Sequence, residues 1–253
     1  MSSPLSTSQI QDFARDGFVV VPGLYGAAEL EQIARWTDEL ARAPEEPGKA
    51  MMYFEASRLE PGRRLLNRIE DYCPHHAGFD ALLRHGALRA AVGQLFGEPA
   101  VMFKDKINFK LPGGDGFTPH QDVQAGWDRY AKLYITASVS IDAATRDNGC
   151  LELVAGRHRE GPLGPSFAPL PEEVTAGMDF VPCETRPGDV VLFDSFTPHR
   201  SAPNTSRLPR RVLYVTYNRA SEGDVRRRYF ADKRAAYPPD CEREPGREYV
   251  FRV

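Results

Sequence analysis

The second half of the chain constrains the fold most, because from Ala100 onward it consists of short segments rich in β-branched and aromatic residues. Clusters of Gly, Pro, Asn and Asp separate these segments, which is the pattern of strands joined by tight turns. The predicted strands cover residues 101–111, 132–141, 150–154, 179–182, 190–194 and 211–219. Many short strands in succession favour two packed sheets closed into a jelly roll.

The first hundred residues predict helices instead. Residues 27–43 keep the period of an amphipathic helix, with an apolar stripe of Leu30, Ile33, Ala34, Thr37, Leu40 and Ala41. We expect further helices at 6–16 and 78–96, a buried strand at 18–22, and irregular structure at 50–73. The predicted fold class is mainly β with a helical layer: a double-stranded β-helix, or jelly-roll and cupin-like core, with the N-terminal helices packed outside.

The chain of 253 residues has the length of one large domain or two small ones. Its sequence contains no internal repeat, low-complexity tract or linker-like segment. We therefore expect one domain over residues 1–253. Its parts would be a helical layer with pocket segments at 1–99, a jelly-roll core at 100–220 and a C-terminal extension at 221–253.

The charge composition limits the partners that the chain can bind. A net charge of -3 does not provide the basic face that nucleic acid requires. The one basic run, Arg226–Arg228, has Glu222 and Asp224 beside it, so we expect it to form a solvated surface. The expected partner is a small-molecule substrate rather than nucleic acid or a membrane, and the expected state is a monomer or homodimer.

The cysteines and the N-terminal residues indicate in which cellular compartment the protein is expected. The four cysteines are widely spaced and form no Cys-x-x-Cys pair, which is typical of reduced thiols rather than a disulfide or zinc framework. Residues 1–11 lack the basic and apolar regions of a secretory signal. No stretch approaches the roughly 18 apolar residues that span a membrane. We expect a cytoplasmic protein.

Two histidines and an aspartate are the strongest candidates for chemistry. On an extended strand His120 and Asp122 would point to the same face, whereas on a helix they would diverge by about 200°. Pro119 supports the extended form, because the residue before a proline avoids the helical region. His199 follows the predicted strand 190–194, where the mouth of a barrel would present it.

Two imidazoles and one carboxylate form the ligand set of non-haem Fe(II) oxygenases. Three ligands on one face leave positions open for a bidentate cosubstrate and O2, which a closed four-ligand site does not. Two surface histidines beside an acid, or a zinc hydrolase, would give the same three residues. The remaining histidines belong to no such arrangement, and we expect surface or supporting roles for His75, His76, His85 and His158.

An arginine favours iron over zinc. Arg210 begins the predicted strand that contains Val212–Tyr217, and a guanidinium forms a planar fork that binds a carboxylate bidentately. 2-Oxoglutarate bound to iron through its keto acid would direct its far carboxylate to this arginine. Ser201 could donate a hydroxyl bond to the same carboxylate. Arg211 is the competitor, but on a strand it would face the other way.

The chain resembles the phytanoyl-CoA dioxygenase family over nearly its whole length. The motifs that carry the resemblance are Asp16–Val20, His120-Gln121-Asp122, Asn148–Leu151 with Gly156 and His158, Pro187–Val190, and His199 with Ser201 through Arg210. The resemblance implies a double-stranded β-helix, Fe(II), 2-oxoglutarate and O2, and substrate hydroxylation that releases succinate and CO2. By the family motif, His120, Asp122 and His199 hold iron, and Arg210 holds the cosubstrate.

A halogenating branch of that family differs at the carboxylate ligand, which is replaced by a small residue to make room for chloride. Asp122 is present here, so the resemblance favours hydroxylation over halogenation.

The substrate is predicted from four segments expected at the mouth, which mix aromatic residues with both signs of charge: Met51–Glu55, Asn67–Glu70, Lys104–Asn108 and Gln124–Asp128. Aromatic faces and carboxylates bind ammonium groups, and basic side chains bind phosphonate or carboxylate oxygens, so a small zwitterion would suit them. The predicted substrate contacts are Trp127, Tyr53, Glu70 and Lys106. Further predicted cosubstrate contacts are Lys104, Asn108 and Thr118, although the sequence does not separate cosubstrate from substrate among these polar residues.

These segments, and the tail from Tyr229–Arg234 through Tyr249–Val253, resemble the bacterial branch of the family that hydroxylates 2-aminoethylphosphonate and its N-methylated relatives. Ordinary core aromatics and solvated charges are the alternative explanation. Other possible functions are a metal-binding cupin-type isomerase or binding protein, an oxygenase acting on a natural product or an acyl-CoA, and a fold that has lost its chemistry. Arg210 and the intact triad argue against the first and last of these.

Overall fold

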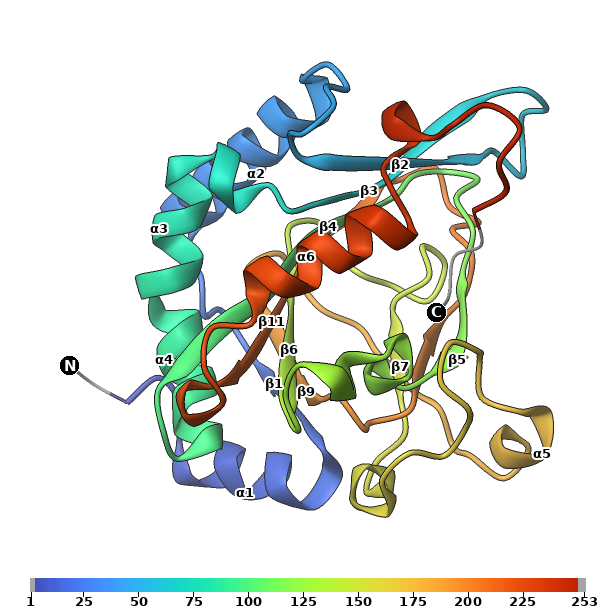
Figure 1. Cartoon of the computed structure of the whole chain (residues 1–253). Helices are drawn as coiled ribbons and strands as arrows, with labels where there is room; N and C mark the ends of the chain where they lie inside the picture. Colours follow the sequence, from blue (N-terminus) through green and yellow to red (C-terminus); the bar gives the residue numbers. More distant parts are fainter. Residues whose placement is uncertain (1–2, 250–253) are drawn as a thin grey trace.

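Two β-sheets lie against each other beneath a layer of helices in the computed structural model, which describes residues 3–249 (Figure 1). The strands are β1 (Phe18–Val21), β2 (Met51–Ala56), β3 (Arg64–Glu70), β4 (Ala100–Lys110), β5 (Phe117–His120), β6 (Tyr134–Ser140), β7 (Leu151–Leu153), β8 (Val181–Cys183), β9 (Val190–Asp194), β10 (His199–Ser201) and β11 (Arg210–Arg219). The major sheet has the order β1-β9-β6-β11-β4-β3-β2, and the minor sheet has the order β5-β10-β7-β8.

The helices are α1 (Thr7–Asp16), α2 (Ala27–Arg42), α3 (Ala77–His85), α4 (Ala87–Phe96), α5 (Glu172–Thr175) and α6 (Arg226–Ala236), with short 3-10 turns between the other elements. The predicted start of the first helix is confirmed, because Ser6 and the Gln9 side chain form a capping box. Among residues 3–249, no helix is long and apolar enough to cross a bilayer.

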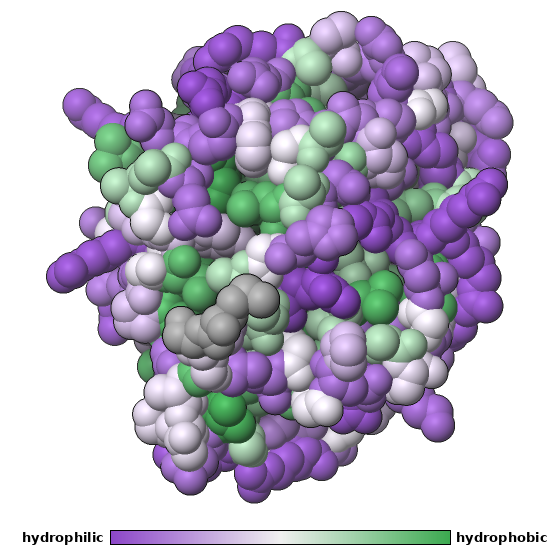
Figure 2. All heavy atoms as spheres, turned by 90° about the vertical axis from the view of Figure 1, so that its left-hand side faces the viewer, coloured by the Kyte–Doolittle hydropathy of each residue, from purple (hydrophilic) through white to green (hydrophobic). Residues whose placement is uncertain are grey.

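The main apolar core lies between the major sheet and the N-terminal helices. Ile107, Leu213 and Val215 point outward from the central strands and pack against helix residues such as Ile33 and Leu83. Each fully buried aliphatic side chain of this kind stabilises the fold by about 1.5–3 kcal/mol. Figure 2 shows the outer face of the helical layer, where hydrophilic residues predominate and hydrophobic ones form small patches. The opposite, inward face of the sheet is therefore available for a polar site.

The first ninety-nine residues contribute more than the predicted helical layer. The expected irregular structure at 50–73 is wrong: β2 and β3 form an antiparallel hairpin that joins β4 through pairs such as Arg68 with Asn108. The hairpin escaped prediction because the inward positions Arg68 and Glu70 of β3 are charged, which hides the apolar alternation of a half-buried strand. β1 also joins this sheet, beside β9.

The predicted helix over 78–96 is two helices. Gly86 has an extended conformation, φ -83° and ψ -174°, and ends α3 while it begins α4. A Cβ at this position would lie 2.5 Å from the carbonyl oxygen of Leu82, so the break requires glycine. The kink lets both helices cover the curved sheet.

The basic run Arg226–Arg228 is only partly the solvated surface that was predicted. Arg227 and Arg228 are exposed, but Arg226 is buried and pairs with Asp71 and Asp105. A buried guanidinium requires such partners, and here they anchor α6 to β4 (Figure 1). All four cysteines are free thiols, as predicted. Of the C-terminal tail, residues 250–253 lie outside the described part of the chain.

Candidate active site

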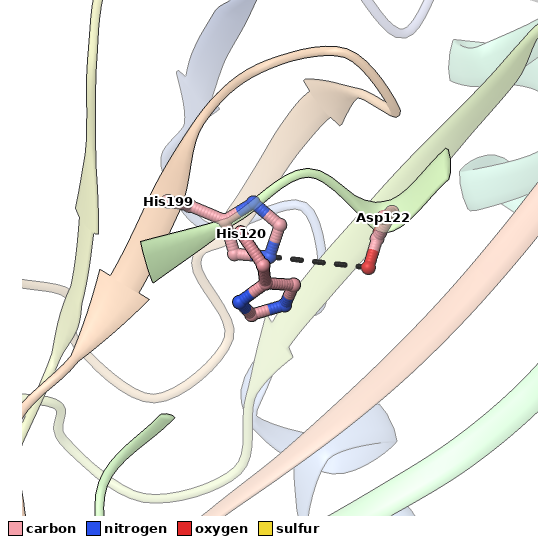
Figure 3. A group of neighbouring side chains, drawn as sticks. All are labelled: His120, Asp122 and His199. Atoms are coloured by element: carbon pink, nitrogen blue, oxygen red, sulfur yellow. Dashed lines mark ion pairs between the residues drawn. The ribbon is translucent and has the colours of Figure 1, made fainter. Parts of the chain in front are cut away.

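His120, Asp122 and His199 converge between the two sheets. Their candidate ligand atoms all lie within 4.8 Å of one another, and His199 Nε2 is 3.9 Å from Asp122 Oδ1 (Figure 3). His120 ends β5 and His199 begins β10, and the two residues pair directly in the antiparallel minor sheet. The 77 residues that separate the two parts of the motif thus fold back to give one cluster of metal-binding groups.

The backbone at the motif differs from the predicted strand in one respect. Asp122 is the first residue of a 3-10 turn, Asp122–Ala125, rather than part of β5. Gln121 keeps extended angles, φ -112° and ψ 137°, so the side chains of His120 and Asp122 still reach the same cluster. The Gln121 side chain donates to the carbonyls of Gly161 and Phe196, which ties the turn to two loops.

His199 also differs slightly from its predicted place. It does not simply follow the strand at 190–194 but belongs to a short strand of its own, β10. Pairing with β5 on one side and β7 on the other fixes the direction of its ring.

Backbone carbonyls orient both imidazoles. His120 Nδ1 lies 2.7 Å from the carbonyl oxygen of Thr118, and His199 Nδ1 lies 3.0 Å from that of Thr197. An Nδ1–H donated to each carbonyl leaves each Nε2 free to accept a metal. Burial lowers the pKa of His120 to about 3, with the neighbouring His199 contributing, and burial also lowers the pKa of His199. Both rings are neutral at neutral pH, the form that binds metals.

Asp122 is ionised, and a hydrogen bond to one of its carboxylate oxygens fixes its orientation. Burial by itself would raise the pKa of Asp122, but His199, His120 and Lys106 outweigh it, and the pKa is lowered. Thr136 on β6 donates to Asp122 Oδ2 at 2.7 Å and lies 3.0 Å from the hydroxyl of Thr216 on β11. Sequence inspection missed this contact, because no local motif connects residues 14 and 80 positions apart. The hydrogen bond joins β6 of the major sheet to the turn that follows β5.

A row of polar side chains faces this cluster from β4. Lys104, Lys106 and Asn108 line the same pocket as the three candidate ligands, as do the predicted Trp127 and Ser201. Residues two apart on a strand share a face, so Lys110 continues the row. Burial lowers the pKa of Lys106 to about 7, and the nearby charge of Lys104 contributes. The pocket is therefore crowded with cations before any ligand enters.

Arg210 lies at one end of this row. It is 1% exposed and pairs across the strands with Lys110, so the two side chains share a face of the sheet. Within the described residues its Nε and Nη2 have no hydrogen-bond partner. Buried donors are almost always paired, so this unfilled fork fits a ligand carboxylate. Arg211 faces the other way, as predicted, and forms ion pairs with Asp142 and Asp38.

Lys110 was missed by sequence inspection. Its Nζ donates to Ser201 Oγ at 2.7 Å and to the carbonyls of Ala202 and Gly149. Burial, followed by the charge of Arg210, lowers the pKa of Lys110 to about 6. The signal that could have found it is the period-two spacing of Lys104, Lys106 and Lys110, combined with Arg210 on the partner strand.

Arg210 and three other predicted contacts are not among the residues that line this pocket. Thr118 is exposed, and its carbonyl orients His120 instead. Tyr53 is buried, donates to the carbonyl of Tyr237 and stacks on that ring. Glu70 is fully buried among basic side chains. Glu70 shares a face of the sheet with Lys106, its partner across the strands, but its carboxylate contacts the chain's own basic side chains instead of lining the pocket.

Comparison with known proteins gives consistent matches. Residues 13–212 match the family described as phytanoyl-CoA dioxygenase (PhyH). The chain is 44% identical over 235 residues to the 2-aminoethylphosphonate dioxygenase of an uncultured bacterium, covering 92% of this chain and 89% of that protein. It is 37% identical over 240 residues to the methylphosphonate hydroxylase of Gimesia maris, covering 94% and 90%.

A solved structure shares the fold. EctD from S. alaskensis, crystallised with 2-oxoglutarate and 5-hydroxyectoine, superimposes with a TM-score of 0.74 over 87% of this chain and 78% of that one, at 22% identity.

Proposed function

The chain belongs to the phytanoyl-CoA dioxygenase family, and from that premise we propose that it hydroxylates a carbon–hydrogen bond of a small phosphonate. It is an Fe(II)- and 2-oxoglutarate-dependent dioxygenase that acts on a small molecule, as the sequence predicted. The observation that carries the substrate class is the row of lysines facing the metal-binding cluster in one pocket.

The residues present fit the metal and the cosubstrate. Two neutral imidazoles and one carboxylate would hold Fe(II) and leave open positions, and the unpaired donors of Arg210 would hold the far carboxylate of 2-oxoglutarate. Bound together, these groups activate O2 and oxidise an unactivated C–H bond, with release of succinate and CO2. The chain's own part is to hold the groups, to exclude water and to orient the substrate.

The carboxylate at Asp122 supports hydroxylation rather than halogenation, because a chloride would need the position that this residue takes. A metal-binding isomerase or binding protein would have no need of a buried arginine whose Nε and Nη2 lack hydrogen-bond partners.

The substrate class follows from the relatives and the charge of the pocket together. The two relatives above are named for 2-aminoethylphosphonate and methylphosphonate, which share only the phosphonate group. The pocket offers Lys104 and Lys106, which suit a tetrahedral oxyanion. We therefore place a phosphonate first, 2-aminoethylphosphonate being the zwitterionic candidate, ahead of quaternary amines, natural products and acyl-CoA.

We also propose that residues 1–253 form one catalytic domain with a double-stranded β-helix at its centre. The support for one domain is that strands from residues 1–99 flank those from residues 100–220 at both edges of the major sheet. The support for the β-helix is the pairing of short antiparallel strands in two facing sheets. A cytoplasmic location and a monomeric or homodimeric state stay predictions from the sequence.

Succinate formation tests the function. Anaerobically purified protein loaded with Fe(II) is given 2-oxoglutarate and O2 with one compound from a panel of phosphonates, betaines, amino acids and an acyl-CoA. We expect 2-aminoethylphosphonate or methylphosphonate to stimulate succinate formation most. Stimulation by an acyl-CoA or a betaine alone would refute the phosphonate assignment, and no stimulation above buffer by any compound would leave the proposed hydroxylation without support.

A further inference from the structure

Glu70 is the centre of a buried cluster that has more positive than negative charge. Its carboxylate is fully buried, lies 2.9 Å from Arg68 Nε and 3.8 Å from Lys104 Nζ, and also contacts Lys233 Nζ. One carboxylate thus faces the guanidinium of Arg68 and the ammonium of Lys104, while burial lowers the pKa of Lys233 well below its ordinary value. Buried charges are costly unless they are compensated, so the surplus indicates an anion that binds nearby.

Two lysines bring this surplus to the metal-binding cluster. Lys104 and Lys106 lie two apart on β4, a rise of roughly 6.7 Å, and both line the pocket that contains His120 and Asp122. Within residues 3–249, Lys106 Nζ has neither a hydrogen bond nor a carboxylate partner, and it lies 4.7 Å from the centre of the Tyr214 ring. An oxyanion between the two ammonium groups could accept from both at about 2.8 Å.

The aromatic rings near the pocket are already occupied by the chain's own cations. Lys104 Nζ lies 5.4 Å from the ring centre of Trp127 and 5.8 Å from that of Tyr229, and Arg68 lies over Tyr53. The sequence-based expectation that Trp127, Tyr53 and Glu70 bind a substrate ammonium group conflicts with these contacts. The same contacts hold Lys104 toward the pocket.

We propose that Lys104 and Lys106 bind the phosphonate group of the substrate and select a dianion over a singly charged head group of the same shape. This inference rests on the proposed function. It assigns the two ends of the β4 row to different ligands: Arg210 and Lys110 to the cosubstrate, Lys104 and Lys106 to the substrate.

The entrance supports the same assignment. Lys104 lines both the inner pocket and an outer cavity of about 430 Å³. Arg129 and Arg247 add positive charge to that cavity beside Asp232 and Glu248, while burial lowers the pKa of Lys233 well below its ordinary value. An anion that enters through the cavity therefore meets Lys104 before it reaches the cluster of metal ligands.

The test compares 2-aminoethylphosphonate with taurine, which has the same amine and carbon chain but carries a sulfonate with one charge. At about pH 8 we expect kcat/KM of the wild-type enzyme to favour the phosphonate by at least about 100-fold, which corresponds to roughly 2.8 kcal/mol. In Lys104→Met and in Lys106→Met this ratio should fall at least about tenfold, or roughly 1.4 kcal/mol, because a bound dianion keeps both ammonium groups protonated and each variant loses one charge–charge contact. Lys132→Met, on the exposed surface, is the matched control.

Calorimetry of methylphosphonate with anaerobic protein holding Fe(II) and 2-oxoglutarate gives a readout independent of turnover. We expect weaker binding in both methionine variants, and recovery in Lys104→Arg and Lys106→Arg. These arginine variants keep the test open if a methionine variant does not fold.

The outcomes separate the two proposals. If the wild-type enzyme does not respond to any phosphonate, the proposed function fails, and the inference fails with it. If the wild-type enzyme hydroxylates 2-aminoethylphosphonate while both methionine variants keep the wild-type ratio and affinity, the inference alone is overturned.

Discussion

The two walls of the pocket hold their functional side chains in different ways. The wall with the metal ligands is made of short strands, four residues in β5 and three in β10, and its imidazoles depend on local bonds to the carbonyls of Thr118 and Thr197. The opposite wall is made of the long strands β4 and β11, of eleven and ten residues. There, strand periodicity and register suffice to align Lys104, Lys106 and Lys110 with Arg210.

One pocket thus combines two ways of positioning side chains: hydrogen bonds that orient each ring, and a regular strand that aligns a row of side chains. The metal ligands need exact angles, which hydrogen bonds to each ring provide. The cations need a common direction and spacing, which a regular strand provides at no further cost. Thr136 links the walls, because its hydroxyl lies on the major sheet and donates to Asp122.

The largest expected effect comes from removing a ligand on the short-strand wall. Asp122→Ala or His199→Ala should abolish Fe(II) binding and lower substrate-dependent succinate formation by roughly 1000-fold or more, since the metal contributes several kcal/mol. Metal analysis after gel filtration and succinate assays measure both. His85→Ala, at an exposed histidine outside the site, should behave like the wild type. Iron-dependent turnover in Asp122→Ala would remove that residue from the ligand set.

The next effect comes from the long-strand wall. Arg210→Ala should raise the KM for 2-oxoglutarate by roughly 30–100-fold, because charge-assisted hydrogen bonds contribute about 2–3 kcal/mol, while Fe(II) still binds. Arg211→Ala is the matched control: it loses ion pairs with Asp142 and Asp38, so it should lower the melting temperature without changing this KM. Equal effects on the KM in both variants would contradict the assignment of Arg210, on the inward face of β11, to the cosubstrate and of Arg211, on the outward face, to stability.

A smaller effect is expected where the walls meet. Thr136→Val removes the hydrogen bond to Asp122 and keeps the shape of the side chain, so Fe(II) affinity should fall by about tenfold. Competition with a chelator measures the affinity. Ser140, on the same strand as Thr136, forms a similar hydrogen bond with Thr185 outside the metal-binding cluster, so Ser140→Ala should leave the affinity unchanged. If both variants lose affinity alike, the bond from Thr136 has no specific role.

The smallest effect concerns the pH dependence of stability. The pKa of Lys110 is lowered from its ordinary 10.5 to about 6, so above about pH 6 the unfolded chain binds a proton that the folded chain lacks. The free energy of unfolding therefore rises with pH in this window. Between about pH 6 and pH 7 the metal-free wild type should gain roughly 1 kcal/mol relative to Lys110→Met, measured by urea unfolding. Parallel pH profiles would show that Lys110 stays charged in the fold.

More of the short-strand wall than of the long-strand wall could be predicted from the sequence. The three candidate metal ligands were predicted because residue types with a known chemistry lie in a short motif and at one distant position, and the assignment of Arg210 to the cosubstrate, made from its place on a strand, stays a prediction. Lys110 and Thr136 were not found, because their roles arise from cross-strand pairing. Tyr53, Glu70 and Thr118 were assigned to ligand binding by their segments, but their side chains lie outside the pocket lining.

The fold shows the same limits. Strands rich in β-branched and aromatic residues, such as β6 and β9, were predicted from the sequence. The hairpin of β2 and β3 was not, because Arg68 and Glu70 occupy inward positions that a polar pocket permits. The break at Gly86 was also missed, since a single glycine within a helical pattern is often tolerated.

The central claim is that the enzyme couples decay of 2-oxoglutarate to hydroxylation of a phosphonate. The most direct measurement counts both products in one reaction: succinate by chromatography and hydroxylated phosphonate by phosphorus NMR. The account predicts about one hydroxylated phosphonate for each succinate formed above the substrate-free background. Succinate that rises with 2-aminoethylphosphonate while no phosphonate is modified would contradict it.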